Sequence, residues 1–163
     1  HTNYSNDVIF LNGECVEPLI RTMQVSSLVS LISKERVIRE KLVELQRSIG
    51  KNSGVVMDGR DIGSVVFPYA EVKFWVTADI KVRAKRRYHE ILNNGGEVDF
   101  NEVVKNLKNR DFEDSNRSIS PLIRPSKSIL VDNSDLTIDQ TLEFTMKIIN
   151  SYFKNNGRDI FLK

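Results

Sequence analysis

The residues of this chain that are best suited to chemistry form a charged group directly after an apolar run. The segment Gly54–Pro68 reads GVVMDGRDIGSVVFP, in which a predicted strand at Gly54–Asp58 runs into Asp58-Gly59-Arg60-Asp61. Such a run between helical patterns is typical of a strand buried in a parallel sheet, and ligands bind beyond the carboxyl ends of such strands. The Asp-Gly-Arg-Asp group is therefore predicted to lie in a binding crevice. A tight surface turn is the alternative, because Asp-Gly is a common turn dipeptide.

Arginines recur at helical spacing in two later segments, VRAKRRY at Val82–Tyr88 and NRDFEDSNR at Asn109–Arg117. The first segment places three arginines on one helix face, and these are Arg83, Arg86 and Arg87. The second segment spaces three charged residues about one turn apart, and these are Arg110, Asp114 and Arg117. Arginine is favoured where a planar, forked group must recognise phosphate. The alternative is that both segments are solvent-exposed helix faces, which is the more common role of a run of charged residues. Together with the Asp-Gly-Arg-Asp group, however, these segments indicate a polyanion site.

The elements that must position these residues fall into two parts. In the first part, Asn12-Gly13 between apolar runs in Val8–Val16 predicts an antiparallel hairpin. Apolar residues at helical spacing then predict a helix from about Ser33 that ends near Gly50.

The second part alternates strands with helices, which predicts a parallel sheet with flanking helices. The expected strands are Gly54–Asp58, Glu71–Val76 and Ile129–Asp132. The expected helices run from about Asp79 to Asn93, from Asp99, and from Thr137 onward. Asp99 with Glu102, and Thr137 with Gln140, have the spacing of a capping box.

Composition limits the classes of protein that fit. With 163 residues, 40% of them hydrophobic, the chain can bury one core, so we expect a single compact domain. The net charge of +2 leaves the basic character local to the arginine groups, which argues against a nucleic-acid binder. A single cysteine, Cys15, suits a reducing cytoplasm, and no apolar run is long enough to span a bilayer. We expect a monomeric, cytoplasmic protein without a membrane partner.

Several motifs taken together resemble one known family. They are IRTMQVSS at Ile20–Ser27, VIRE at Val37–Glu40, VVMDGRDIGSVVFP, VRAKRRY, NRDFEDSNRSISPL and ILVDNS. In these the chain resembles bacterial cytidylate (CMP) kinase, a nucleoside monophosphate kinase with a P-loop fold. The resemblance covers most of the chain, and one departure is Tyr69, where the family usually has Asp.

The resemblance implies a fold class, a division of the chain and an activity. The fold is α/β, with a P-loop kinase-type parallel sheet, flanking helices and a small monophosphate-binding insert that contains the hairpin. The insert spans residues 1–52 and the core spans 53–163, with a lid near 83–117. The activity that the resemblance implies is transfer of the ATP γ-phosphoryl group to CMP or dCMP with Mg²⁺. Such a transfer would need positioning and charge neutralisation rather than a strong base.

The resemblance also implies a role for each candidate residue. The phosphate of CMP would be gripped by Arg60, Arg110 and Arg117. Cytosine would be read by Ser27, Arg39 and Asp61, and the sugar would contact Asp114. The lid would carry Arg83, Arg86 and Arg87, which stabilise the transferred phosphoryl group. Asp58 would organise Mg²⁺ through water, with a structural salt bridge as the competing role.

One motif of the resembled family is absent from this sequence. Nowhere does it contain Gly-x-x-x-x-Gly-Lys-Ser/Thr, the loop that cradles the phosphates of ATP. The chain opens in what resembles the middle of such a kinase and therefore looks like a fragment. The alternative is a non-catalytic CMP-binding remnant without an ATP site. A third interpretation is an arginine-rich RNA-binding domain, but this chain lacks the aromatic residues interleaved with basic ones that would favour it.

Overall fold

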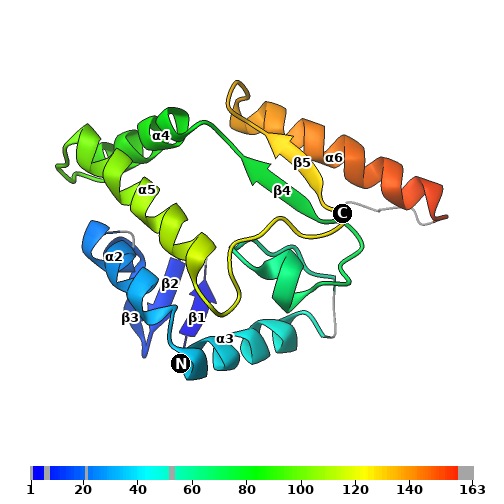
Figure 1. The fold of residues 1–163 in the computed structure, drawn as a ribbon, viewed down its shortest axis with the longest axis horizontal. Coiled ribbons are helices and arrows are strands. Elements are labelled where there is room, and N and C mark those ends of the chain that lie inside the picture. The colour runs from blue at the N-terminus through cyan, green and yellow to red at the C-terminus, as the bar shows by residue number, and fades with distance from the viewer. Residues whose placement is uncertain (1, 6–7, 21, 52–53, 158–163) are drawn as a thin grey trace.

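The computed structural model describes residues 2–5, 8–20, 22–51 and 54–157 (Figure 1). The chain begins with an antiparallel sheet of β1 (Thr2–Ser5), β2 (Val8–Leu11) and β3 (Glu14–Cys15). Strands β2 and β3 turn at Asn12 and Gly13, whose φ angles of 52° and 89° are those of a hairpin turn with positive φ at both central residues. The predicted hairpin is confirmed, whereas the sequence did not reveal β1.

Three helices follow the hairpin. They are α1 (Glu17–Ile20), α2 (Met23–Ile32) and α3 (Arg36–Ile49). The predicted helix ending at Gly50 is confirmed as α3. The four apolar residues whose spacing predicts this helix are, however, at least 40% exposed, and these are Ile38, Leu42, Leu45 and Ile49.

The second part of the chain builds a two-stranded parallel sheet. Strand β4 (Phe74–Thr77) pairs with β5 (Ile129–Asp132), with Phe74 opposite Ile129. This part of the chain also contains three long helices, namely α4 (Ile80–Asn93), α5 (Phe100–Asn116) and α6 (Ile138–Asn155). All three begin where the sequence predicts, because the side chains of Asp79, Asp99 and Thr137 accept hydrogen bonds from backbone amides of the first turn.

The predicted strand at Gly54–Asp58 is wrong. Residues 54–58 form neither helix nor strand, and Val56 is fully exposed. A strand needs a neighbour to pair its backbone groups, and among the described residues the parallel sheet contains β4 and β5 alone. Beyond the Asp-Gly-Arg-Asp group the chain instead forms η1 (Ile62–Val66), a single turn of π-helix.

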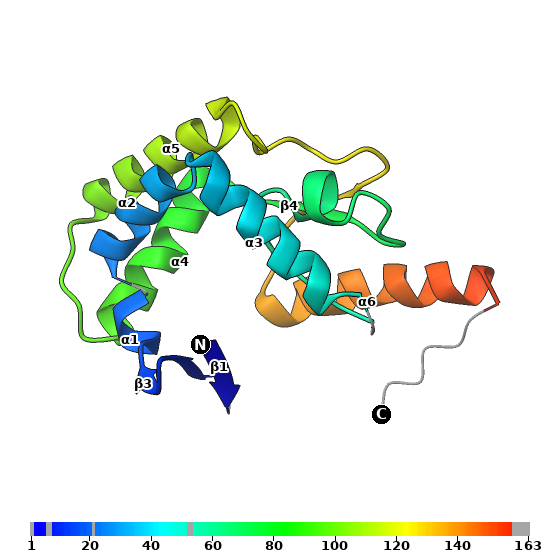
Figure 2. The same ribbon diagram turned by 90° about the horizontal axis from the view of Figure 1, so that it is seen from below.

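The elements gather into two groups, and the chain crosses between them at α3, between β4 and α4, and after α5 (Figure 1). Figures 1 and 2 both show α2, α4 and α5 side by side, while β4, β5 and α6 lie together across the molecule, and α3 lies near η1. Among the described residues the buried apolar side chains are Val66, Ala78, Ala84, Val103 and Val131. No helix in the described ranges is long and apolar enough to cross a membrane.

Candidate functional site

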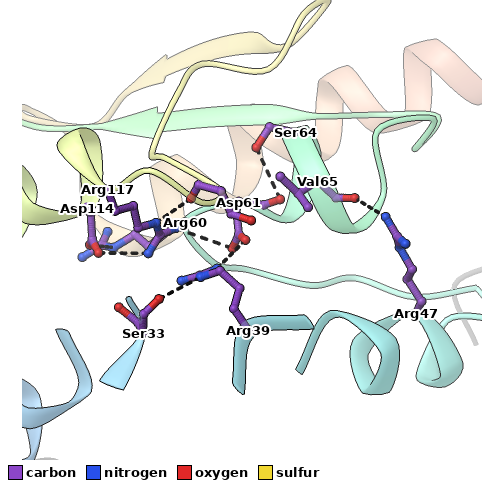
Figure 3. Close-up of polar contacts among 10 residues, drawn as sticks. Ser33, Arg39, Arg47, Arg60, Asp61, Ser64, Val65, Asp114 and Arg117 are labelled. Atoms are coloured by element: carbon purple, nitrogen blue, oxygen red, sulfur yellow. Dashed lines mark hydrogen bonds and ion pairs between the residues drawn. The ribbon is translucent and has the colours of Figure 1, made fainter. Parts of the chain in front are cut away.

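Two buried carboxylates lie among arginines between α3, α5 and η1. Asp61 is 7% exposed and Asp114 is 5% exposed. Asp61 is the N-cap residue of η1, whereas Asp114 lies in the last turn of α5. Carboxylates are rarely buried unless they are paired, and Figure 3 shows that Arg39, Arg60 and Arg117 are the partners of this pair.

Asp61 is held mainly by α3. Arg39 Nη1 donates to Asp61 Oδ2 at 2.6 Å, and Arg39 Nε donates to the carbonyl oxygen of Ser33 at 2.9 Å. The carbonyl of Ser33 therefore orients the arginine that holds the carboxylate. The other oxygen of Asp61, Oδ1, lies 4.0 Å from Arg117 Nη2, which is beyond hydrogen-bonding distance. It is directed toward a second guanidinium without being bonded to it.

Asp114 is held from two sides. Arg117 Nη1 donates to Asp114 Oδ1 at 3.2 Å, and Arg60 Nε lies 3.0 Å from Asp114 Oδ2. The contact with Arg60 is an ion pair without the alignment of a hydrogen bond, so Oδ2 retains acceptor capacity. Two cationic partners thus surround the buried carboxylate.

The loop after α5 returns to the same place and orients Arg117. Ser120 has a φ of 50°, and the reversed chain lets Leu122 N donate to the carbonyl of Asp114 at 2.8 Å. Arg117 Nε donates to the carbonyl of Ser120 at 2.5 Å. Arg117 Nη2 is buried and makes no hydrogen bond. Its capacity to donate a hydrogen bond is therefore unused among the described residues.

Positive charge exceeds negative charge in this cluster. Burial and the neighbouring Arg60 lower the pKa of Arg110, while burial and Arg39 lower the pKa of Arg117. The cluster thus consists of two aspartates, Asp61 and Asp114, and four arginines that repel one another, Arg39, Arg60, Arg110 and Arg117. These six side chains together carry a net charge of +2. A phosphate monoester carries ≈ −1.5 to −2 charges at pH 7, so one such group would balance the site.

The α4 arginines lie on one helix as predicted but have different neighbours. Arg83 Nη1 donates to Asp111 of α5 at 2.7 Å, and its Nε donates to the carbonyl of Ala78. Arg86 donates to the side chain and carbonyl of Asn133 and to the carbonyl of Leu136, after β5.

Arg87 pairs with Glu90 at 2.8 Å. After burial and Arg60, the charge of Arg87 contributes to the lowered pKa of Arg110, whereas Asp111, the partner of Arg83, acts in the opposite direction. The lid role of all three remains a prediction.

Two further candidates stand apart from the cluster. Asp58 is exposed, and the described residues contain no group of three carboxylate, histidine or cysteine side chains that could hold a metal. Its contact with Mg²⁺ through water remains a prediction. Ser27 lies within α2, but its side chain falls outside the described part of the structure.

Sequence reasoning missed one arginine near the site. Arg47 of α3 donates to the carbonyls of Val65 and Val66, at the end of η1 (Figure 3). The only signal in the sequence was its spacing of eight residues from Arg39, about two turns of helix.

Comparison with known proteins gives a consistent result. A family model described as cytidylate kinase matches residues 1–151. The chain is 45% identical over 143 residues to a cytidylate kinase of Flavobacterium psychrophilum, covering 88% of the chain and 63% of that protein. It is 50% identical over 137 residues to a cytidylate kinase of Bacteroides fragilis, covering 84% of the chain and 60% of that protein. The chain therefore spans somewhat more than half the length of these relatives.

Proposed function

The chain belongs to the cytidylate kinase family, and we propose that it binds CMP or dCMP as the acceptor of the γ-phosphoryl group of ATP. The observation that carries the proposal is the cluster of four arginines around two buried aspartates, with its net charge of +2. A nucleoside monophosphate supplies a group of the matching charge. It also supplies a base and a sugar for the two carboxylates.

The phosphate would bind to Arg60, Arg110 and Arg117. Arg117 Nη2 is buried without a hydrogen bond, and a phosphate oxygen would satisfy it. Arg60 is 40% exposed at its side chain, so it can turn from Asp114 toward an arriving phosphate.

The base would bind at Asp61 and Arg39. Cytosine presents an exocyclic amine beside the acceptors N3 and O2. Asp61 Oδ1 can accept from the amine while Oδ2 stays bonded to Arg39, and Arg39 can donate toward the acceptors. Uracil lacks the amine, so this pair favours cytosine. Asp114, beside the phosphate arginines, would accept from a sugar hydroxyl.

The transfer step requires no strong general base, because the attacking oxygen belongs to an ionised phosphate. The arginines of the cluster would neutralise the acceptor, and those of α4 would approach the donor phosphates and exclude water. Mg²⁺ would come with ATP, bound largely by phosphate oxygens and waters as is usual for this ion. Asp58 is the residue proposed to contact its water shell.

Calorimetric titration of the chain with CMP, UMP and cytidine tests the proposal. We expect CMP to bind more tightly than UMP, because the base pocket selects cytosine, and more tightly than cytidine, because cytidine has no phosphate for the arginines to bind. The affinity for CMP should fall with salt, since the bound group is an anion. Equal affinity for CMP and cytidine would contradict the phosphate site, and equal affinity for CMP and UMP would contradict the base site.

A further inference from the structure

Helix α3 contacts η1 at both ends of the turn, through two arginines that lie about two helical turns apart. Arg39 bonds to the carboxylate of Asp61, the residue that begins the turn. Arg47 Nη2 donates to the carbonyl of Val65 at 2.7 Å, and its Nε donates to the carbonyl of Val66 at 3.1 Å, at the end of the turn (Figure 3). The two arginines therefore fix η1 along the length of α3.

The carbonyls that Arg47 holds are ones that a short helical turn leaves without a partner. The last carbonyls of any helix lack an amide donor from a following turn. A cation at this end also complements the helix dipole. Arg47 supplies both the donors and the charge, with a fork that reaches two adjacent carbonyls at once.

Val65 and Val66 are in turn bonded to Asp61. The carbonyl of Asp61 accepts from Val65 N at 2.8 Å and from Val66 N at 3.2 Å. A shift of the two residues held by Arg47 is therefore transmitted through one turn of backbone to the carboxylate. A small movement of the carboxylate is enough to change its contact with Arg117, because Asp61 Oδ1 lies only 4.0 Å from Arg117 Nη2.

Close packing against side chains also confines η1, both at the end of α3 and at the loop before β5. A Cβ atom added at Gly63 would lie 3.0 Å from the ring of Pro125, and one added at Gly50 would lie 2.6 Å from the ring of Phe67. The turn thus lies between the end of α3 and the loop before β5. Isolated π-helical turns occur frequently at functional sites, and this one directly follows the base-reading carboxylate.

We propose that Arg47 is a positioning residue for base recognition. By holding the carbonyls of Val65 and Val66, it keeps the carboxylate of Asp61 between Arg39 and Arg117, where that carboxylate can accept a hydrogen bond from the base. The inference rests on the proposed function in one respect, namely that Asp61 reads the base. A role in stability alone is the competing account, and it predicts no effect on the choice between bases.

The test compares Arg47→Met, Arg47→Lys and Arg36→Met in this chain. Arg36 is the matched control, because it lies on the same helix, is 75% exposed at its side chain and pairs with Glu40 of α3. The preference for CMP over UMP should narrow about tenfold in Arg47→Met and remain unchanged in Arg36→Met. Arg47→Lys keeps the cation but lacks the fork, so it should restore part of the preference and serves if the methionine variant folds poorly.

Two measurements separate positioning from stability. In an Asp61→Ala background, which leaves no side-chain acceptor to position, Arg47→Met should narrow the preference no further, because coupled residues are not additive. An unchanged preference in Arg47→Met, or equal narrowing in both backgrounds, would overturn the inference.

Hydrogen exchange gives a readout that does not depend on the proposed function. The amides of Val65, Val66 and Phe67, which close the turn, should exchange at least about tenfold faster in Arg47→Met than in Arg36→Met. Unchanged exchange would overturn the inference whatever the ligand data show. A wild-type chain without preference for CMP, but with accelerated exchange in Arg47→Met, would reject base reading by Asp61 and leave Arg47 as the residue that holds the turn.

Discussion

Arg39 Nη1 lies 2.6 Å from Asp61 Oδ2, and this ion pair joins two segments 22 positions apart in the chain. Both side chains are nearly buried, at 12% and 9% exposed. Removing one member of such a pair leaves the other charge buried without compensation. The effect of a mutation in the cluster therefore has two sources, the interaction that is removed and the uncompensated charge that stays behind.

Replacing Arg60 by alanine should weaken the binding of CMP by about 1 to 2 kcal/mol, because alanine cannot make a charge-assisted hydrogen bond to phosphate. Arg60→Lys should restore little, since lysine lacks the fork. Arg36→Ala, which removes an exposed arginine outside the cluster, is the control for the change of one charge. Calorimetry with CMP measures both, and an Arg60→Ala protein that binds CMP like the control would remove Arg60 from the phosphate site.

Asp61→Ala should reduce the preference for CMP over UMP, because the deleted carboxylate faces an amine that only cytosine carries. A buried group left unsatisfied costs about 1 to 3 kcal/mol, which sets the size of the change in preference. Asp61→Asn keeps the shape and one acceptor, so it should fold better and discriminate at an intermediate level. Competition titrations with the two nucleotides give the ratio, and a ratio equal to that of wild type would rule out Asp61 as the base reader.

Asp114→Asn should lower the free energy of unfolding by about 1 to 3 kcal/mol. The substitution removes the negative charge that compensates the buried Arg117. Loss of the ion pair with Arg60 should cost less, because the Arg60 side chain is 40% exposed and solvent screens its charge. Asp111→Asn on the same helix is the control, because its pair with Arg83 is about one-third exposed and should matter less. Urea denaturation measures the free energy of unfolding of both variants. Equal decreases in Asp114→Asn and Asp111→Asn would show that the burial of Asp114 adds nothing to the cost of the substitution.

The carboxyl group of Asp132 at the end of β5 should respond to a change at Ser134. Hydrogen bonds from the hydroxyl and backbone amide of Ser134 lower the pKa of Asp132. A lowered folded-state pKa stabilises the fold above the ordinary aspartate value near 4, and that contribution is lost as the pH falls through the folded value. Ser134→Ala should raise the pKa, as followed by NMR titration, and a pKa unchanged from wild type would contradict the assigned cause.

CMP should raise the thermal stability of this 163-residue chain, and ATP with Mg²⁺ should not. The sequence contains no Gly-x-x-x-x-Gly-Lys-Ser/Thr loop to hold the donor phosphates. A ligand that binds only the folded state stabilises it by about 2.7 kcal/mol at one hundred times its dissociation constant. Thermal unfolding with each ligand, together with an assay for CDP, provides the check. A shift with ATP, or any CDP formed, would mean that a donor site exists elsewhere in the chain.

The elements that local chemistry specifies were predictable from the sequence. Asn12 and Gly13 adopt the positive φ angles that a hairpin turn requires, and Asp79, Asp99 and Thr137 cap the helices that they precede. These features depend on residues within a few positions of one another. The candidates for the acceptor site were proposed from spacing and from the resemblance of their motifs, and their roles stay predictions.

The partners of those candidates were decided only by the tertiary structure. Spacing placed Arg83 and Arg86 on one helix face, but it could not show that one contacts Asp111 and the other the loop after β5. The run at Gly54–Asp58 has the composition of a strand, yet a strand forms only where another chain segment pairs with it. Arg47 bonds to backbone carbonyls, which carry no side-chain identity, so the sequence held no sign of these partners beyond the spacing of Arg47 from Arg39. Local preferences are encoded residue by residue, whereas pairing and long-range ion contacts exist only once distant segments have been brought together.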